Sequence, residues 1–326
     1  MGRKDFKMVD VSIIIVNYNG FDLLKNCLNT LYKYADGFNF EVILIDNNSI
    51  EGDIEEVVKG FDKVKLIKNK INLGFSRANN IGLNLAQGKY VLFLNNDIYF
   101  TENSIKKIFD FAEGNNEKTF IGCKLLNPDK SWQTSTACFP SLLNFLSSNF
   151  FLYRLFPSSS YLNKYYLQKK KINVPIEVDY VLGAFLFGDR GVLLKLNGFD
   201  ERFFFYAEDI DLCYRLSLIG GKTIFYPETS VVHIGGASVK NNQWFKYKNK
   251  AISELQFFQK HKNGIELIFG IIIHYSGNLI RIPITFIVGT IMLNKQLLIR
   301  SYFHAKLLFI YPKNLFKHKL EDKIIY

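Results

Sequence analysis

Three short hydrophobic runs lie in the first hundred residues of the chain, and each is followed at once by polar residues. The runs are residues 11–16 (VSIIIV), 41–45 (EVILI) and 90–94 (YVLFL). Continuous apolar runs of this length are typical of parallel strands that are buried on both faces. Amphipathic stretches such as 21–34 and 76–87 separate them. The pattern therefore predicts an α/β fold, in which buried parallel strands are joined by crossover helices.

Polar side chains follow each of these predicted strands. In open α/β sheets ligands bind beyond the carboxyl ends of the strands, so Tyr18, Asp46 and Asp97 are expected to converge there. Asn and Asp are also ordinary turn formers, which explains any one segment taken alone. Three such segments in succession favour a nucleotide site. The segments are Asn17-Tyr18-Asn19-Gly20, Asp46-Asn47-Asn48-Ser49 and Asn95-Asn96-Asp97.

A cluster of acids lies in the segment 203–215, FFFYAEDIDLCYR. Carboxylates beside apolar rings are desolvated, which raises their pKa values toward the range of a general base. Acids in the first turn of a helix also have a purely structural explanation, because they complement the helix dipole and pair with a cation one turn later. We adopt that explanation for Asp211, which Arg215 follows by four residues. Glu208 and Asp209 remain the candidates for catalysis.

Six segments, taken in order, resemble the inverting family 2 glycosyltransferases of the GT-A fold, of the rhamnosyltransferase-like kind. The resemblance covers the chain to about residue 238. It implies a Rossmann-like mixed, mostly parallel sheet flanked by helices, in a catalytic domain at residues 1–260. Residues 261–326 are expected to form a helical, apolar and basic extension that associates with membranes. The segments are residues 11–20, 42–49, 72–97, 181–187, 198–216 and 232–238.

The resemblance implies a metal site. The acid in the position of Asp97 closes a DxD-type motif, which here reads Asn95-Asn96-Asp97 and keeps only its last carboxylate. Mg²⁺ typically uses one or two protein carboxylates, and phosphate oxygens and water complete its shell. His233 resembles a further ligand, and imidazole suits Mn²⁺ better than Mg²⁺, although a lone His is more often structural. The expected cofactor is Mg²⁺ or Mn²⁺.

The resemblance also implies a donor site and a base. Tyr18 would pack on the nucleotide base, and Asp46 would accept a hydrogen bond from a pyrimidine ring. Arg77 would either reach the diphosphate or remain a solvated surface residue. Asp209 would remove the proton from the acceptor hydroxyl, and Glu208 would orient Asp209 or contact the acceptor. The remaining expected donor-binding residues are Asn17, Asn72 and Asn96.

Composition is consistent with a large globular domain. The chain has 326 residues and is 48% hydrophobic, which is enough to bury a large core. Cys27, Cys123, Cys138 and Cys213 show no paired or metal-type spacing, so buried thiols in a reducing compartment are expected. Residues 1–10 contain no apolar signal core, which predicts a cytoplasmic domain.

The C-terminal fifth is unusual in both charge and hydropathy. From Lys260 onward ten Lys and Arg face three acids, a net +7 of the chain's +11. Within the segment 264–294, the apolar runs 267–280 and 282–294 are split by Arg281, and neither reaches the ~20 residues of a span. His274, Asn278 and Arg281 would form one polar stripe on a helix. This pattern predicts a helix in the interface of an anionic membrane, ahead of core helices with the stripe at the surface or a span that tolerates Arg281.

The family resemblance implies a metal-dependent, inverting glycosyltransferase, and the C-terminal pattern predicts that it is peripheral on the cytoplasmic face of the cell membrane. It would move a sugar from a nucleotide-sugar donor, dTDP-rhamnose or a UDP-sugar, to a hydroxyl of a lipid-linked or oligosaccharide acceptor in O-antigen or capsule assembly. Nucleic acid is not an expected partner, because no recognition motif accompanies the basic charge. The alternatives are a catalytically silent nucleotide-sugar or glycan-binding subunit and a nucleotidyltransferase. A nucleotidyltransferase is the less favoured of the two, because this sequence has no Gly-rich basic loop after the first predicted strand.

Overall fold

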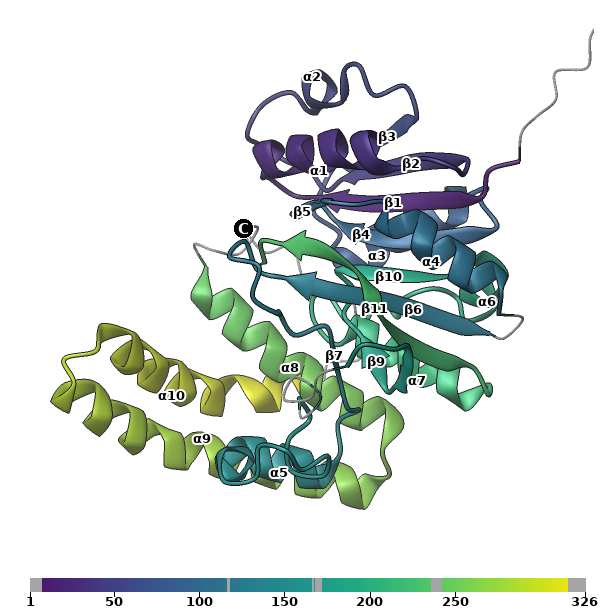
Figure 1. The fold of residues 1–326 in the computed structure, drawn as a ribbon. Coiled ribbons are helices and arrows are strands. Elements are labelled where there is room, and N and C mark those ends of the chain that lie inside the picture. The colour runs from purple at the N-terminus through teal and green to yellow at the C-terminus, as the bar shows by residue number, and fades with distance from the viewer. Residues whose placement is uncertain (1–7, 116–117, 166, 168–171, 236–241, 316–326) are drawn as a thin grey trace, which may run out of the picture. The chain divides into compact units, whose positions relative to one another are not determined.

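The computed structural model describes residues 8–115, 118–165, 167, 172–235 and 242–315, the last six of these by their backbone alone. The chain divides into two compact units (Figure 1). The sheet unit comprises residues 1–137, 171–204 and 208–240, and the helical unit comprises 138–170, 205–207 and 241–326. The boundary predicted at residue 260 falls within the last turn of helix α8 (Gln243–His261). The functional division at that residue stays a prediction.

The described part of the sheet unit contains a mixed sheet of order β3-β2-β1-β4-β10-β6-β11-β5, in which β8 also pairs with β11. The pairs β3-β2, β2-β1, β1-β4 and β6-β11 are parallel, and β10 runs antiparallel to both of its neighbours. The predicted parallel strands are confirmed. The strands are β1 (Val11–Asn17), β2 (Phe40–Asp46), β3 (Val64–Lys68), β4 (Tyr90–Asn95), β5 (Ile98–Tyr99), β6 (Thr119–Leu126), β8 (Ile176–Val178), β10 (Phe185–Asp189) and β11 (Lys222–His233).

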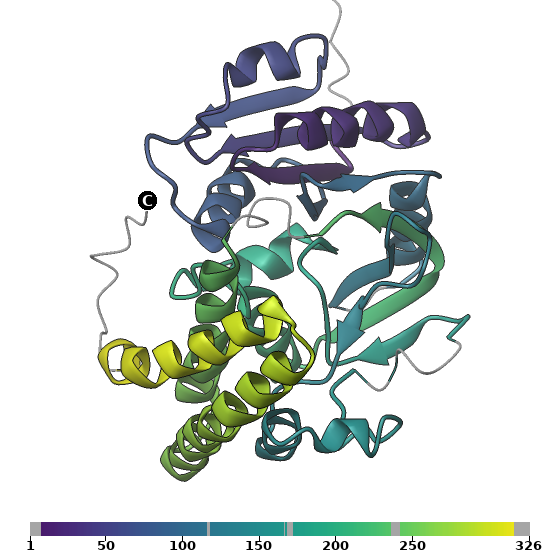
Figure 2. The ribbon, with the colours of Figure 1, turned by 90° about the vertical axis from the view of Figure 1, so that its left-hand side faces the viewer.

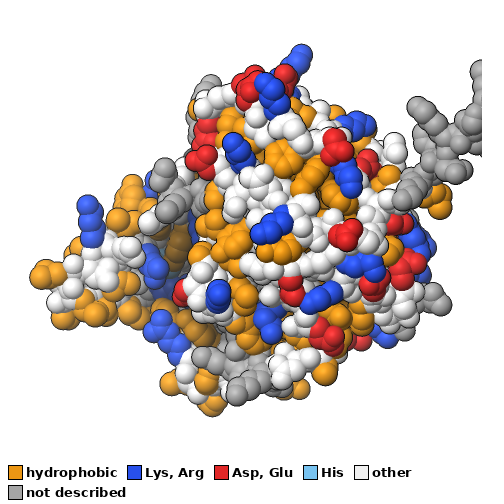
Figure 3. Space-filling view, turned by 45° about the horizontal axis from the view of Figure 1, so that its top comes forward, with side chains coloured by type: hydrophobic (Ala, Val, Ile, Leu, Met, Phe, Trp, Pro, Cys, Tyr) orange, Lys and Arg blue, Asp and Glu red, His pale blue; other side chains and the backbone are white. Residues whose placement is uncertain are grey.

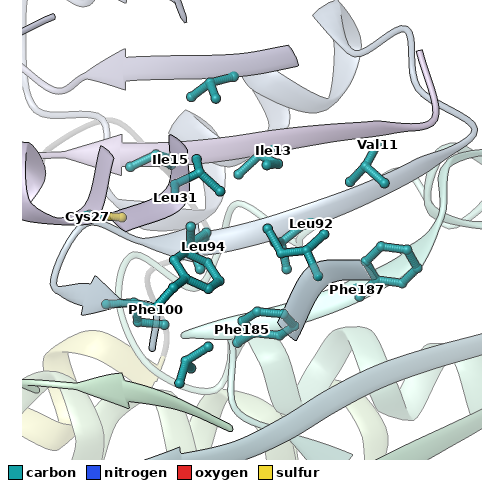
Figure 4. Packing of buried hydrophobic residues seen from close by; sticks show 14 of the residues in the cluster. Val11, Ile13, Ile15, Cys27, Leu31, Leu92, Leu94, Phe100, Phe185 and Phe187 are labelled. Atoms are coloured by element: carbon teal, nitrogen blue, oxygen red, sulfur yellow. The ribbon is translucent and has the colours of Figure 1, made fainter. Parts of the chain in front are cut away.

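Helices cover both faces of this sheet, because alternate residues of each strand point to opposite sides. Val11, Ile13 and Ile15 of β1 pack in one cluster with Cys27 and Leu31 of α1 (Figure 4). On the other face, Gly82 of α3 approaches Ile14 so closely that an added Cβ would lie 2.4 Å from its Cγ2. The remaining elements of the sheet unit are α1 (Phe21–Tyr34), α2 (Ile54–Val58), α3 (Phe75–Leu85), α4 (Ser104–Glu113), α6 (Arg190–Lys195), α7 (Glu208–Leu218) and the strand pair β7 (Thr136–Ala137) with β9 (Tyr180–Val181).

The helical unit contains α5 (Leu142–Asn149), η1 (Leu152–Arg154), α8, α9 (Gly264–Ile291) and α10 (Lys295–Leu315). Its core includes Phe145, Leu255, Phe258 and Leu307. In Figure 2, α9 and α10 run side by side as a hairpin, and they pack on one another and on α8.

The two apolar runs on either side of Arg281 form one continuous helix, α9, with Pro283 inside it. Arg281 does not interrupt the helix, because its guanidinium donates to the carbonyl of Ser148 and lies 5.1 Å from the ring centroid of Phe151. Among the described residues α9 is the helix long and apolar enough to cross a membrane, with a mean hydropathy of 1.5 over 18 residues.

The alternative that placed the polar stripe of α9 at the surface is wrong. His274 and Asn278 are 5% and 2% exposed, and they lie inside the helical unit. The helix therefore turns its polar side inward and much of its apolar side outward.

The thiols of Cys27, Cys123 and Cys213 are free and buried as predicted, whereas Cys138 is only half-buried.

Candidate functional site

The polar residues that follow β1, β2 and β4 meet at one edge of the sheet. The Asn96 amide donates to Asn17 Oδ1 at 2.6 Å, and the Asn17 amide donates to Asp46 Oδ1 at 3.2 Å. All three side chains are buried. Parallel pairing of β1 with β2 and β4 sets this arrangement, since it aligns their carboxyl ends. Tyr18 directly follows β1 and is half-buried at the same edge.

Asp46 also shapes the turn that follows it. Its carboxylate accepts hydrogen bonds from the Ser49 amide at 3.1 Å and from the Ser49 hydroxyl at 2.5 Å. With the bond from Asn17, three of about four acceptor positions are in use, which leaves one for a ligand N–H. Asp46 is therefore pre-oriented, and its spare lone pair suits the ring N–H of a uracil or thymine.

The loop at Asn72 packs against the segment that precedes the acid cluster. Asn72 Oδ1 accepts from the Gly74 amide at 2.9 Å and from the Asn47 side chain at 3.1 Å. Gly74 has a φ of +81°, and an added Cβ would lie 2.7 Å from the ring of Phe204. The glycine is needed for both reasons: a left-handed backbone and a close approach.

Asp97 and His233 face one another across β5 and β11. His233 pairs with Ile98 in the antiparallel ladder, which brings its Nε2 to 3.2 Å from Asp97 Oδ1. The second carboxylate oxygen of Asp97 accepts from the Gly235 amide at 3.0 Å. Asp97 Oδ1 is buried and has no hydrogen-bond partner among the residues that the structure describes. The fold therefore brings the two predicted ligands close together.

Gln133 determines which nitrogen of His233 carries the proton. Its amide nitrogen donates to Asn127 Oδ1 at 3.0 Å and to the carbonyl of His233 at 3.1 Å, which fixes the orientation of the amide. Gln133 Oε1 must then be the acceptor that lies 2.6 Å from His233 Nδ1. Nδ1 therefore carries a proton, and a ring protonated at Nδ1 alone has its lone pair on Nε2, which lies close to Asp97.

A lone pair and a carboxylate oxygen that face one another in a buried site suit a cation between them. Asn95 lies at the same place, with its amide nitrogen 3.3 Å from Nε2. The described residues contain no cluster of three or more His, Cys, Asp or Glu side chains with metal-binding geometry. The residues that fit a divalent cation are Asp97 and His233, with the remaining coordination positions open to phosphate oxygens and water.

Asp209 lies in the first turn of α7, where its carboxylate is oriented by two backbone amides. Oδ2 accepts from Gly183 at 2.9 Å and Oδ1 accepts from Ile210 at 2.8 Å. Desolvation raises the pKa of Asp209, and these amides partly offset the effect. Burial, followed by repulsion from Asp209, raises the pKa of Glu208 well above its usual value. Because the two carboxyls repel one another, Glu208 and the half-buried Asp209 favour a state that shares one proton and one negative charge.

The base candidate and the cation candidate belong to the same edge of the sheet. Asn95, two residues before Asp97, donates its backbone amide to the carbonyl of Ala184 at 3.0 Å. Gly183, the neighbour of Ala184, contacts Asp209. The antiparallel pairing of β4 and β10 thus joins the two halves of the site.

The other acid and the predicted arginine have structural partners. Arg215 donates to Asp211 at 2.8 Å, so the structural explanation of Asp211 is confirmed. Arg77 is half-exposed and lies 3.8 Å from a carboxylate oxygen of Glu201. Its diphosphate role stays a prediction. Gly236 lies outside the described residues.

Sequence reasoning missed Gln133, Ser49 and Gly183. Ser49 was visible as the end of the polar segment after the second strand, but nothing indicated its bonds to Asp46. No motif marks Gln133, and although Gly183 lies in the matched segment 181–187, nothing indicated its bond to Asp209. Both residues act through contacts with residues far away in the sequence.

Comparison with known proteins agrees with this geometry. Residues 12–188 match the family described as glycosyl transferase family 2. Rhamnosyltransferase WbbL of Escherichia coli K12 is 29% identical over 231 residues, which cover 68% of this chain and 83% of that protein. N-acetylglucosaminyl-diphospho-decaprenol L-rhamnosyltransferase of Mycobacterium tuberculosis is 27% identical over 242 residues, which cover 69% and 76%.

Two solved structures share the fold at 15% identity. The mannosyltransferase PcManGT of Pyrobaculum calidifontis, in complex with GDP-Man and Mn²⁺, has a TM-score of 0.54 and covers 96% of this chain and 89% of its own. GalNAc-T7 with UDP, GalNAc and Mn²⁺ has a TM-score of 0.56 and covers 78% of this chain. The matched part is 48% of the GalNAc-T7 chain, so this protein spans about half of that structure.

Proposed function

Because the chain belongs to glycosyl transferase family 2, we propose that it inverts an anomeric centre while moving a sugar from a nucleoside diphosphate to a hydroxyl of a lipid-linked saccharide. The observation that carries the proposal is the pair of buried Glu208 and half-buried Asp209, which Gly183 connects to the strand end that bears Asp97. The product would be part of a bacterial surface polysaccharide such as O-antigen or capsule.

Asp209 acts as the base in this proposal. Its carboxylate takes the proton of the acceptor hydroxyl as the hydroxyl oxygen forms a bond to the anomeric carbon of the donor sugar. The bond from that carbon to the diphosphate oxygen breaks, and the electron pair leaves with the nucleoside diphosphate. Attack from the face opposite the leaving group inverts the centre in one displacement. The backbone amides of Gly183 and Ile210 hold the carboxylate in position while leaving lone pairs for the hydroxyl.

Glu208 keeps its own proton. Glu208 Oε2 is buried and finds no hydrogen-bond partner within the described ranges, and the raised pKa of the Glu208 carboxyl favours the neutral acid. A neutral neighbour places no second negative charge beside Asp209, so Asp209 is the member of the pair that ionises and accepts the proton.

Asp97 and His233 would hold a Mg²⁺ or Mn²⁺ ion that neutralises negative charge on the donor diphosphate. Two observations support this assignment: Asp97 Oδ1 has no hydrogen-bond partner in the described part of the chain, and Gln133 accepts from His233 Nδ1, so Nε2 is the ring nitrogen available to a metal ion. The structures of GalNAc-T7 and PcManGT both contain Mn²⁺, which agrees with a divalent ion in this fold.

The donor would lie along the strand ends at Asn17, Tyr18, Asp46, Asn72 and Asn96. A half-buried aromatic ring and a spare acceptor on Asp46 suit a uracil or thymine base. Two relatives are named as rhamnosyltransferases, and this favours dTDP-rhamnose over a UDP-sugar as the donor.

The acceptor would be attached to a membrane lipid, as the decaprenol in one relative's name suggests. The enzyme would then be peripheral on the cytoplasmic face of the cell membrane. A catalytically silent binding subunit would not need the buried Glu208–Asp209 pair, so this alternative is not favoured.

A transfer assay with wild-type protein tests the proposal. Candidate donors are first selected by the rise in melting temperature that they cause, with Mn²⁺ present and absent. The selected donor is then supplied with a lipid-linked saccharide, and the anomeric configuration of the product is assigned by NMR. The proposal expects release of nucleoside diphosphate and an inverted linkage. A retained configuration, or release of pyrophosphate, would overturn it.

A further inference from the structure

The hairpin of α9 and α10 holds its polar side chains in its interior. His304 Nδ1 lies 2.7 Å from Asn278 Oδ1, and His304 Nε2 lies 2.9 Å from the hydroxyl of Tyr247 on α8. Ser301 donates to the carbonyl of Ile282 at 2.9 Å. Burial lowers the pKa values of His274 and His304 to about 4, so this interior is neutral at physiological pH. Asn278, Ser301 and His304 thus have hydrogen-bond partners inside the helical unit and are not turned toward water.

The opposite side of α9 is an apolar stripe along its entire length. Its exposed large residues recur at intervals of three, four or seven, which places them on one face of the helix. Residues 268–293 contain one charged side chain, Arg281, and it is half-buried. We call this set the outer stripe; it consists of Ile265, Ile268, Phe269, Ile272, Leu279, Ile280, Ile284, Ile287 and Ile291.

The turn after α9 extends the same surface. Ile291, Met292 and Leu293 are 76%, 66% and 90% exposed, and Phe286 and Val288 are exposed beside them. Figure 3 shows exposed hydrophobic side chains with basic ones between them where the end of the hairpin comes into view. Monomeric soluble proteins rarely expose contiguous apolar patches of more than a few hundred Å², so this surface is expected to be covered.

Charge indicates what covers it. Lys295 and Arg300 are exposed next to the apolar turn, and the whole chain carries a net charge of +11. An apolar stripe flanked by cations complements the acyl boundary and the anionic headgroups of a bilayer. The choice of lipid over a second copy of the chain also rests on the proposed function, whose acceptor is carried by a lipid.

We propose that the outer stripe and the turn 292–294 are seated in the interfacial layer of an anionic bilayer, with α9 lying in the plane of the membrane. A spanning helix would need an apolar surface on all sides, whereas one side of α9 is packed against α5, α8 and α10. Lys295 follows the apolar turn immediately, and at interfacial depth its ammonium reaches the headgroups. The protein would thus be monotopic.

A flotation assay with the full chain tests this surface. Vesicles of phosphatidylethanolamine and phosphatidylglycerol are compared with vesicles of phosphatidylcholine. The variant Ile272→Asp/Ile287→Asp places two carboxylates on the outer stripe, where the side chains are 54% and 53% exposed. The matched control Ile50→Asp/Leu218→Asp makes the same change at exposed positions of the sheet unit, which are 81% and 65% exposed. Melting temperatures of all proteins are recorded to confirm folding.

The expected result is that wild type and control float with anionic vesicles, while the stripe variant loses at least about tenfold in partitioning. Equal flotation of the stripe variant would overturn the proposal. So would a wild-type dimer that does not float and that the stripe variant converts to a monomer, because a second copy would then cover the stripe. A transfer assay with a water-soluble acceptor separates the two proposals. If wild type floats but does not transfer sugar, only the proposed enzyme mechanism is refuted. If it transfers sugar but does not float, only the proposed membrane-binding surface is refuted.

Depth is tested with a Leu279→Trp variant and lipids brominated near the headgroup or near the chain end. Leu279 lies on the outer stripe, 56% exposed. Stronger quenching by the shallow bromolipid than by the deep one is expected for a helix in the interface. Stronger quenching by the deep bromolipid would show that α9 spans the bilayer and would refute the monotopic arrangement.

Discussion

Replacing Gln133 by Leu is expected to weaken metal binding without touching either proposed ligand. The substitution removes the acceptor 2.6 Å from His233 Nδ1 and the donor 3.1 Å from the His233 carbonyl. The ring then loses the contact that selects its tautomer, and its Nε2 lone pair is no longer held toward Asp97. Loss of an outer-shell partner of a metal-binding His typically costs about 10–100-fold in affinity. This corresponds to about 1.4–2.7 kcal/mol, which is comparable with one unsatisfied buried polar group.

The assay is a titration of Mn²⁺, followed by electron paramagnetic resonance, in the presence of the nucleoside diphosphate that the protein binds best. Gln133→Glu is the matched variant, because its carboxylate still accepts from Nδ1–H. We expect it to retain Mn²⁺ affinity to within about threefold, while Gln133→Leu loses about tenfold or more. Melting curves show whether each variant is folded. Wild-type Mn²⁺ affinity in folded Gln133→Leu would refute the argument that Gln133 orients the ligand.

Three further outcomes follow from the site. Glu208→Gln should raise the melting temperature at pH 8 and leave it unchanged near pH 4. The pKa of Glu208 is raised in the folded state, so the stability that neutral Glu208 contributes is present below the unfolded-state pKa and is lost as pH rises through the folded-state pKa. Gln does not ionise, so the variant keeps this stability at pH 8. A variant less stable than wild type at pH 8 would contradict the buried neutral acid. Asn95→Asp should bind Mn²⁺ about tenfold more tightly in the same titration, because it adds a carboxylate oxygen where the amide nitrogen lies 3.3 Å from His233 Nε2; weaker binding would argue against a cation there. Gly74→Ala should destabilise the fold by about 2–4 kcal/mol in urea unfolding, since it combines left-handed strain with a clash against Phe204. Gly60→Ala, with a φ of +94° and open space, should cost only about 1–2 kcal/mol, and equal costs would show that the Phe204 contact does not matter.

The sequence predicted the parts of the fold that depend on local pattern. The apolar runs at 11–16, 41–45 and 90–94 are parallel neighbours in the sheet, and their polar ends meet as expected. Parallel pairing makes this prediction possible, because it brings equivalent strand ends together without knowledge of side-chain packing.

The role of Gln133 could not be predicted, because it depends on a contact with a residue 100 positions away. The orientation of α9 could not be predicted for a different reason. A period of 3.6 residues identifies a polar side and an apolar side, but it does not state which side faces the protein. Asn278 lies in the interior because His304 of α10, which also contacts Tyr247 of α8, supplies a polar partner there.

The most direct test of the central claim is transfer by Asp209→Asn, with Asp200→Asn as the control. Asp200 pairs with Arg202 at the surface of the sheet unit, and its replacement should leave kcat near the wild-type value. An amide cannot accept the acceptor proton, so Asp209→Asn should lower kcat by about 10²–10⁴-fold while donor affinity changes little. Wild-type activity should also fall as pH decreases through the raised pKa of the Glu208–Asp209 pair. Full transfer activity in Asp209→Asn would contradict the account.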